Sequence, residues 1–240
     1  MLVAFWVSLI LFVSGLNQGF SGFGVILVAL PLLTLILDIK SVVPLIALSA
    51  VVIAIMLFLQ LKERFDFQKI KPLLIGAIPG IPIGVFVLKE IDTSIIQWVL
   101  GLILIMYALY RLLISPRRQG IRESWAYLFG LLSGIMAGVL SAAAPPIIVY
   151  LTLQSWDKDQ IKVSLQAFFI ISGSVVVVFH ALTGLTTLLT LKLFAISTPP
   201  LLLGTYLGSL LYGRINENQY RKVMFVFLGL LGIFTIWRAM

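Results

Sequence analysis

Apolar stretches long enough to span a lipid bilayer recur along the whole chain. A crossing helix needs about 20 apolar residues, and the sequence holds stretches at roughly 2–38, 41–60, 72–88, 94–113, 125–154, 163–183, 193–211 and 221–239. Charged residues make up only 11% of the chain, against about 25% in a soluble globular protein. No polar stretch is long enough to form a separate soluble domain. The sequence therefore predicts an all-α polytopic membrane protein in a lipid bilayer.

Two of these stretches are too long for one crossing and are interrupted near the middle. Stretch 2–38 contains a glycine cluster at 19–24, and stretch 125–154 contains Ser-Ala-Ala-Ala-Pro-Pro at 141–146. An interrupted helix is tolerated in a membrane only where the freed backbone is buried in protein or lines a cavity. We therefore expect each stretch to form a helix-turn-helix hairpin that returns to the side it came from. The N-terminus has no basic region or cleavage site, so it is expected to be a membrane segment.

The basic residues then separate into two unequal groups. Four fall on one side: Lys40, Lys89, Lys192 and Arg238. Thirteen fall on the other: Lys62, Arg64, Lys69, Lys71, Arg111, Arg117, Arg118, Arg122, Lys158, Lys162, Arg214, Arg221 and Lys222. The positive-inside rule makes the larger group cytoplasmic, which leaves both termini outside. Topology thus accounts for the net charge of +8, and no nucleic-acid partner is expected.

This topology divides the chain into two halves of equal plan and opposite orientation, 1–116 and 117–240. Each half has one broken hairpin, 2–38 or 125–154, and three further transmembrane helices. The motif Ser-Gly-x-x-x-Gly at 14–19 recurs at 133–138, and a proline-rich, seemingly broken span at 76–82 falls on 195–200. Inverted repeats with discontinuous helices are the signature of secondary transporters. We therefore expect one integral membrane domain made of two inverted repeats.

The two breaks have the chemistry of an anion site. A helix that restarts inside a membrane exposes unpaired backbone N–H groups and a partial positive charge. Serine suits the N-cap of such a helix, glycine lets a ligand approach the backbone, and proline suits the first turn. The alternative is that these small residues only allow close helix packing. The expected substrate-binding residues are Asn17, Gln18, Ser21, Gly22, Gly24, Ser141, Ala142, Ala143 and Pro145.

The glycine-rich break followed by an apolar run and a proline, Gly-Phe-Gly-Val-Ile-Leu-Val-Ala-Leu-Pro at 22–31, resembles the TauE/SafE sulfite exporter family over essentially the full chain. The second half departs from the family pattern, because it has Ala-Ala-Ala-Pro-Pro at 142–146 in place of a second glycine cluster. The resemblance implies a bacterial cytoplasmic-membrane transporter for sulfite or an organosulfonate. We expect the helix starts of the two opposed hairpins to hold this anion, and we expect no enzymatic activity.

Two other functions remain open. Gly-Phe-Ser-Gly at 19–22 followed by His180, the only histidine, matches the order of groups in a rhomboid-like intramembrane serine protease with Ser21 as nucleophile. A protease would have no need for a second hairpin, and no sequence feature resembles the surface of a membrane scaffold. In a transporter His180 is a possible proton-coupling group, and Gln166 is expected to make a helix-packing hydrogen bond. All nine carboxylates lie in loops or at span ends and cysteine is absent, so no metal site or cofactor is expected.

Overall fold

The part of the chain that the computed structural model describes is helical and contains no strand. It covers residues 2–22, 24–113, 121–154, 156–211, 226 and 229–237. The labelled helices are α1 (Leu2–Ser21), α2 (Val25–Leu33), α3 (Ile39–Leu61), η1 (Lys62–Arg64), α4 (Phe67–Glu90), α5 (Thr93–Leu113), α6 (Trp125–Leu140), α7 (Ala144–Leu153), α8 (Lys158–Leu182) and α9 (Leu188–Leu210). The predicted all-α class is confirmed. Most of the predicted last span, 221–239, lies outside the described residues.

Six of the described helices are long and apolar enough to cross a membrane: α1, α3, α4, α5, α8 and α9. The other three α-helices are short, with 9 residues in α2, 16 in α6 and 10 in α7. At a rise of 1.5 Å per residue, α2 and α7 are only about 14 and 15 Å long, half of a bilayer core. Each hairpin therefore pairs a longer first helix with a half-length second helix.

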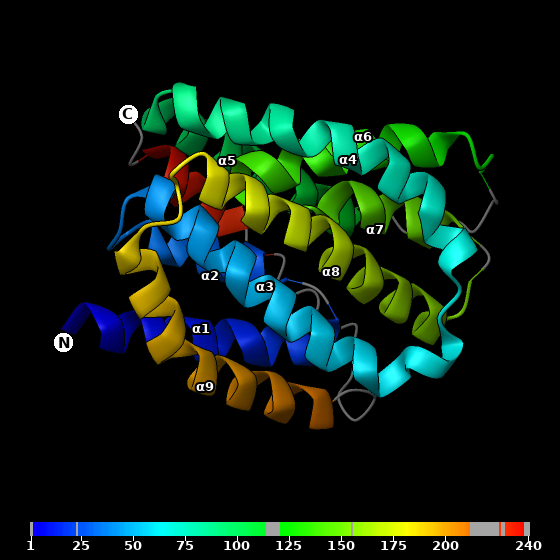
Figure 1. Ribbon diagram of the computed structural model, residues 1–240, viewed down its shortest axis with the longest axis horizontal. Coiled ribbons are helices and arrows are strands. Elements are labelled where there is room, and N and C mark those ends of the chain that lie inside the picture. Colours follow the sequence, from blue (N-terminus) through cyan, green and yellow to red (C-terminus); the bar gives the residue numbers. More distant parts are fainter. Residues whose placement is uncertain are drawn as a thin grey trace.

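The helices run roughly along the long axis of the molecule, and both hairpins return to the end from which they start (Figure 1). The turn after α2 lies at the same end as the N-terminus, and the turn after α7 lies at the opposite end, where α6 begins. The breaks predicted within 19–24 and 141–146 are thus present, between α1 and α2 and between α6 and α7.

Aspartate caps begin four of the described helices at the ends of the molecule, including α5, where Asp92 accepts from the backbone N–H of Ser94. Asp38 accepts from the backbone N–H of Lys40 at the start of α3, and Asp66 accepts from that of Gln68 at the start of α4. Asp157 accepts from Gln160 at the start of α8. Side-chain acceptors of this kind satisfy the orphan N–H groups of a first helical turn. These caps explain where the spanning helices begin.

The prolines of α4 and α9 do not break these helices, contrary to the sequence-based expectation. We call α4 and α9 the third spans, because each is the third apolar stretch of its half when the hairpin is counted as the first. Helix α4 continues through Pro72, Pro79 and Pro82, and α9 continues through Pro199 and Pro200. Proline removes one backbone hydrogen bond, and neighbouring helices in a membrane protein can compensate for it. The two true breaks differ because they contain residues with positive φ.

Two glycine-lined helix pairs hold the hairpins to the third spans. In the pair α4–α6, a Cβ added at Gly80 would collide with the carbonyl oxygen of Leu131, and one at Gly134 with that of Ala77. In the pair α1–α9, the same collisions arise between Gly204 and Phe12 and between Gly15 and Leu201. The backbones therefore touch directly, as in small-residue packing of membrane helices.

These two interfaces follow one pattern in the numbering. Gly15 and Gly134 are 119 residues apart, as are Phe12 and Leu131, while Ala77 and Leu201 are 124 apart, as are Gly80 and Gly204. Each contact between α1 and α9 thus has a counterpart between α6 and α4. The sequence-based match of 76–82 with 195–200 places the third spans 119 residues apart, whereas these contacts place them 124 residues apart. The second half therefore has five more residues than the first before its third span.

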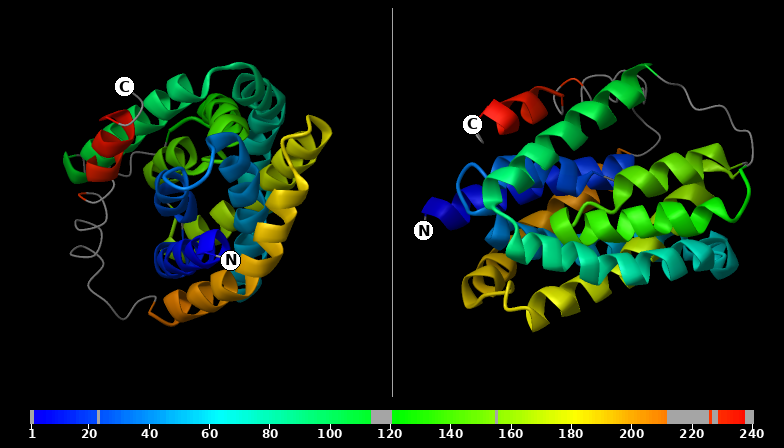
Figure 2. Two further views of the ribbon diagram at one scale, coloured as in Figure 1. Left: turned by 90° about the vertical axis from the view of Figure 1, so that its left-hand side faces the viewer. Right: turned by 90° about the horizontal axis from the view of Figure 1, so that it is seen from above.

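The helical stretch 229–237 lies beside α5 in both views of Figure 2. A Cβ added at Gly232 would lie 2.8 Å from the carbonyl oxygen of Gly101, which fits that placement. Large apolar side chains are exposed along the outer faces of the helices, among them Phe86, Leu102 and Leu203. These faces suit contact with lipid.

Candidate functional site

The first break is built by two glycines with positive φ. Gly22 has a φ of 79° and Gly24 has a φ of 114°, a region that side chains with a Cβ rarely adopt. Gly24 is the N-cap residue of α2, and no side chain caps that helix from its own N-cap position. The chain reverses here because only glycine tolerates two such conformations without strain.

The side chains of Asn17 and Gln18 hold this break in shape. The amide nitrogen of Asn17 donates to the carbonyl oxygen of Gly24 at 3.2 Å, and the amide oxygen of Gln18 accepts from the backbone N–H of Val25 at 2.8 Å. Both side chains are buried. Gln18 thus takes the place of an N-cap for α2, and it shields one N–H group at the start of that helix.

The second break uses a serine where the first uses glycine. Ser141 ends α6 in the left-handed conformation, with a φ of 56°. Its hydroxyl donates to the carbonyl oxygen of Val43 in α3 at 2.9 Å. Ser133 on α6 donates to the carbonyl oxygen of Ala143, and Pro145 lies in the first turn of α7, as expected.

The prediction that Ser21 and Ser141 are N-cap residues is wrong. Ser21 is the last residue of α1, and its hydroxyl donates back to the carbonyl oxygen of Asn17 at 2.8 Å. Ser141 is the C-cap of α6, and Ala143 is the N-cap of α7. Each serine stands on the incoming helix because the turn needs further residues before the outgoing helix can begin.

A cavity of about 30 Å³ lies between the two breaks. On the same scale a buried water needs on the order of 10–15 Å³, so the cavity is sized for a small solute. The first break contributes Gln18 and Gly24 to its lining, and the second contributes Ser141, Ala142, Ala143 and Pro145. The cavity therefore joins six of the nine residues expected to bind the substrate. Asn17, Ser21 and Gly22 belong to the first break but do not line it.

Two long helices complete the cavity, and their residues are not among the nine expected to bind the substrate. Helix α3 contributes Ala47 and Ala50, and α8 contributes Phe169, Ser172 and Gly173. The hydroxyl of Ser172 donates to the carbonyl oxygen of Phe168 in its own helix. Small residues at helical spacing are the only sequence signal for this lining, and they are common in membrane helices.

The lining is mainly apolar, so few groups can meet a charge. The first turns of α2 and α7 carry N–H groups without an intrahelical partner, and the helix dipole makes both starts partly positive. Pro145 and Pro146 have no N–H, so α7 presents fewer donors than α2. This arrangement can hold a small anion by backbone groups and amide side chains.

His180 lies away from the first break. Its ring is fully buried, its Nε2 is 3.2 Å from the carbonyl oxygen of Gly138, and its Nδ1 has no partner. Neither ring nitrogen therefore contacts Ser21. The pair needed for a serine protease is not assembled, because the two candidate residues contact different helices.

No cluster of three potential metal ligands occurs among the described residues. Gln166 makes the interhelical hydrogen bond that the sequence led us to expect, since its Nε2 donates to the carbonyl oxygen of Gly22 at 2.7 Å. That bond links α8 to the first break.

A model of the family described as sulfite exporter TauE/SafE matches residues 7–235. A probable sulfite/organosulfonate exporter TauE from Cupriavidus necator is 24% identical to the chain over 167 residues. This match covers 68% of the chain and 65% of the relative, slightly less than two thirds of that protein's length. No solved structure matches the chain.

Proposed function

Because the chain belongs to the TauE/SafE sulfite exporter family, we propose that it moves a small sulfur oxyanion across the bacterial cytoplasmic membrane. Membership confirms the resemblance recognised in the glycine-rich break at 22–31, and it agrees with the expectation that the chain is not an enzyme. Sulfite and organosulfonates are the named cargo of the relative. For this chain they are the proposed substrate class.

The observation that carries the proposal is the cavity that both helix breaks line. We propose that the anion binds there between the starts of α2 and α7. Backbone N–H groups at helix starts bind oxyanions without a neighbouring cation, because the N–H groups and the helix dipole act together. The amide of Gln18 turns its oxygen to Val25, which leaves its NH2 end as a donor for the anion.

The proposed transport mechanism is alternating access by two inverted repeats, 1–116 and 117–240. The matched contacts of α1 with α9 and of α6 with α4 support this division, since each hairpin packs on the third span of the other half. Rocking of one half against the other would open the cavity to each side in turn.

The proposed orientation follows the charge distribution. At the end of the molecule where η1 lies, Arg64 forms ion pairs with Asp157 and Asp159. At the other end, Lys40 Nζ donates to the carbonyl oxygen of Lys89. We assign the end with η1 to the cytoplasm because it carries the larger basic group, so both termini are extracytoplasmic.

Transport by the purified full-length chain in proteoliposomes tests this function. Vesicles loaded with labelled sulfite, methanesulfonate or acetate should release the two sulfur oxyanions faster than protein-free vesicles do. Acetate is smaller than methanesulfonate and has a planar carboxylate, so acetate release no faster than from protein-free vesicles would indicate recognition of the sulfur oxyanion. Release of all three anions at the protein-free rate would contradict the proposal.

A further inference from the structure

Lys162, in the second turn of α8, is a buried cation beside the first break. Only 5% of its surface is exposed. A Cβ added at Gly22 would lie 3.2 Å from Cγ and 3.4 Å from Cε of Lys162, so the lysine stem lies across the glycine backbone. A buried ionisable residue in a membrane protein usually marks an ion or substrate pathway. In the sequence, Lys162 is distinguished only as one of the basic residues near the cytoplasm.

The next turn of α8 reaches the same glycine. Gln166, which is fully buried, donates through Nε2 to the carbonyl oxygen of Gly22, and its Oε1 has no hydrogen-bond partner. Phe169 and Gly173 continue this face of α8 into the cavity lining. One helix face thus carries a cation, an unsatisfied acceptor and the wall of the cavity, in that order.

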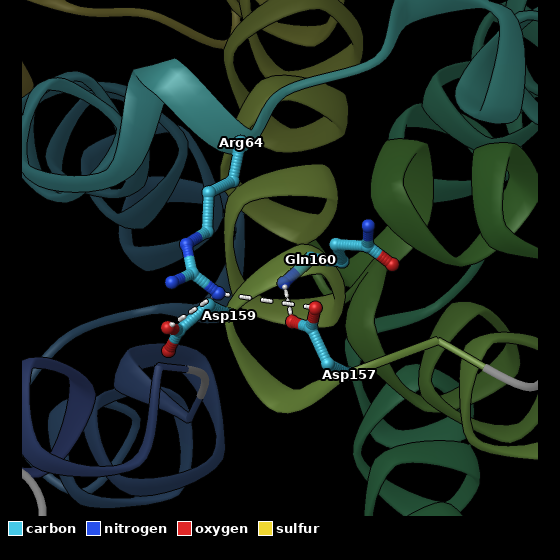
Figure 3. Close-up of polar contacts among 4 residues, drawn as sticks. All are labelled: Arg64, Asp157, Asp159 and Gln160. Carbon is cyan, nitrogen blue, oxygen red and sulfur yellow. Dashed lines mark hydrogen bonds and ion pairs between the residues drawn. The ribbon is translucent and has the colours of Figure 1, made fainter.

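An ion-pair cluster lies at the N-terminal end of α8, where this helix face begins (Figure 3). Arg64 of η1 is 3.3 Å from a carboxylate oxygen of Asp159 and 3.9 Å from one of Asp157. Asp159 precedes Lys162 by three residues, which places the two side chains on neighbouring positions of the helix surface. The carboxylate of Asp159 is therefore paired with the exposed Arg64 and close enough to the buried Lys162 to favour its charged form.

We propose that Lys162 is the entry site of the substrate, where the sulfur oxyanion meets the lysine ammonium group before it passes Gln166 into the cavity. This inference rests on the proposed transport function and extends it to a residue outside the two breaks. The anion replaces the carboxylate of Asp159 as the counter-charge of Lys162. Asp159 stays in its ion pair with Arg64. The free acceptor of Gln166 takes a hydrogen bond from hydrogensulfite or from a water molecule that accompanies the anion.

Replacement of Lys162 by methionine tests the role of its charge. Lys162→Met keeps the length and apolar surface of the stem, so its contact with Gly22 is retained. Loss of a hydrogen-bonded charge at a binding site corresponds to about a 10- to 100-fold rise in the substrate concentration for half-maximal transport. Lys71→Met is the matched control, since Lys71 is an exposed lysine in the second turn of α4 at the same end of the molecule.

A chemical restoration separates charge from packing. The natural chain has no cysteine, so Lys162→Cys provides a single thiol. A methanethiosulfonate reagent with an aminoethyl group rebuilds a lysine-like cation there, and the propyl reagent adds the same length without charge. Methanesulfonate is the substrate for this assay, because sulfite cleaves mixed disulfides. We expect the aminoethyl reagent alone to restore transport.

Two results would overturn the inference while leaving the proposed function standing. One is wild-type half-saturation for Lys162→Met in a protein that transports. The other is equal restoration of Lys162→Cys by the charged and neutral reagents. Absence of sulfur-oxyanion transport by the wild-type protein would instead contradict the proposed function itself.

Discussion

Gln166 donates a hydrogen bond of 2.7 Å from its side-chain amide to the backbone carbonyl oxygen of Gly22, although the two residues lie 144 positions apart. Gly22 is also the residue crossed by the stem of Lys162. The first break is thus held by α8 from outside and by Asn17 and Gln18 from within. Its shape depends on contacts across the two halves of the chain.

A bulky residue at Gly22 is therefore expected to block transport. Gly22→Leu forces a side chain into a φ of 79° and into the space of Lys162. Gly184→Leu is the matched control, because Gly184 has a φ of 77° but no atom within 4 Å of an added Cβ. The backbone strain of a left-handed conformation, about 1–2 kcal/mol, is common to both variants.

Proteoliposome transport and thermal unfolding in detergent measure this difference. We expect the two variants to lose similar stability from backbone strain, and only Gly22→Leu to lose at least tenfold in transport rate. Equal transport by both variants would mean that the first break has no part in the pathway.

Cysteine labelling tests the orientation. Lys71 and Lys89 are exposed residues near opposite ends of α4, and 18 helical residues separate them by about 27 Å. In intact cells, a membrane-impermeant thiol reagent should label Lys89→Cys and leave Lys71→Cys unlabelled until the membrane is opened. The reverse pattern would invert the proposed topology.

The two break serines are expected to differ in importance. The Ser21 hydroxyl bonds within its own helix, whereas that of Ser141 crosses to α3. Ser21→Ala should reduce transport affinity less than about tenfold, since an ordinary hydrogen bond contributes about 1 kcal/mol. Ser141→Ala should cost more, because it removes the hydrogen bond that ties the second break to α3.

A serine protease would give the opposite ranking. It would lose activity by several orders of magnitude when its nucleophile is removed, and a fluorophosphonate probe would label Ser21. We expect no covalent labelling of the wild-type protein. Labelling that disappears in Ser21→Ala would contradict the transporter assignment.

Equivalent glycines of the two halves should respond alike. Gly80→Ala and Gly204→Ala each push a methyl group against a carbonyl oxygen of the facing helix, and overpacking of this kind costs about 1–3 kcal/mol. Gly229→Ala is the control, because its added Cβ would be 3.7 Å from the nearest atom, Ala108 Cβ. Detergent unfolding that shows destabilisation in only one half would argue against an inverted repeat.

The sequence predicted the helix breaks because their residues have a local physical effect. Gly22 and Gly24 adopt positive φ, and Pro145 lies in the first turn of the returning helix. These are properties of single residues and short motifs, so they can be recognised without the fold. Pro79 and Pro82 were misleading because proline weakens a helix, and whether the helix then breaks depends on its neighbours.

The contacts that complete the site could not be predicted in the same way. Lys162 has the same charge as the loop lysines near it, and its burial depends on where α8 meets the first break. Ala47 and Ala50 line the cavity, yet alanine is common in every membrane helix. Ser21 fits the composition of an N-cap but stands on the wrong helix. In each case the deciding contact joins segments far apart in the chain.

Equilibrium binding of labelled sulfite to the purified protein tests the central claim, that the anion occupies the cavity between the two breaks. The variants Gly24→Leu and Ala143→Leu add bulk at lining residues of the two breaks. At Gly24 the added Cβ would lie 2.7 Å from the amide nitrogen of Asn17, so leucine there distorts the first break beside the cavity. Ala143 has ordinary helical φ and ψ, so leucine adds bulk there without backbone strain. Gly184→Leu serves as the folded control. We predict saturable binding by the wild type and the control, and loss of that binding in both cavity variants. Wild-type affinity in correctly folded Gly24→Leu and Ala143→Leu proteins would show that the anion binds elsewhere.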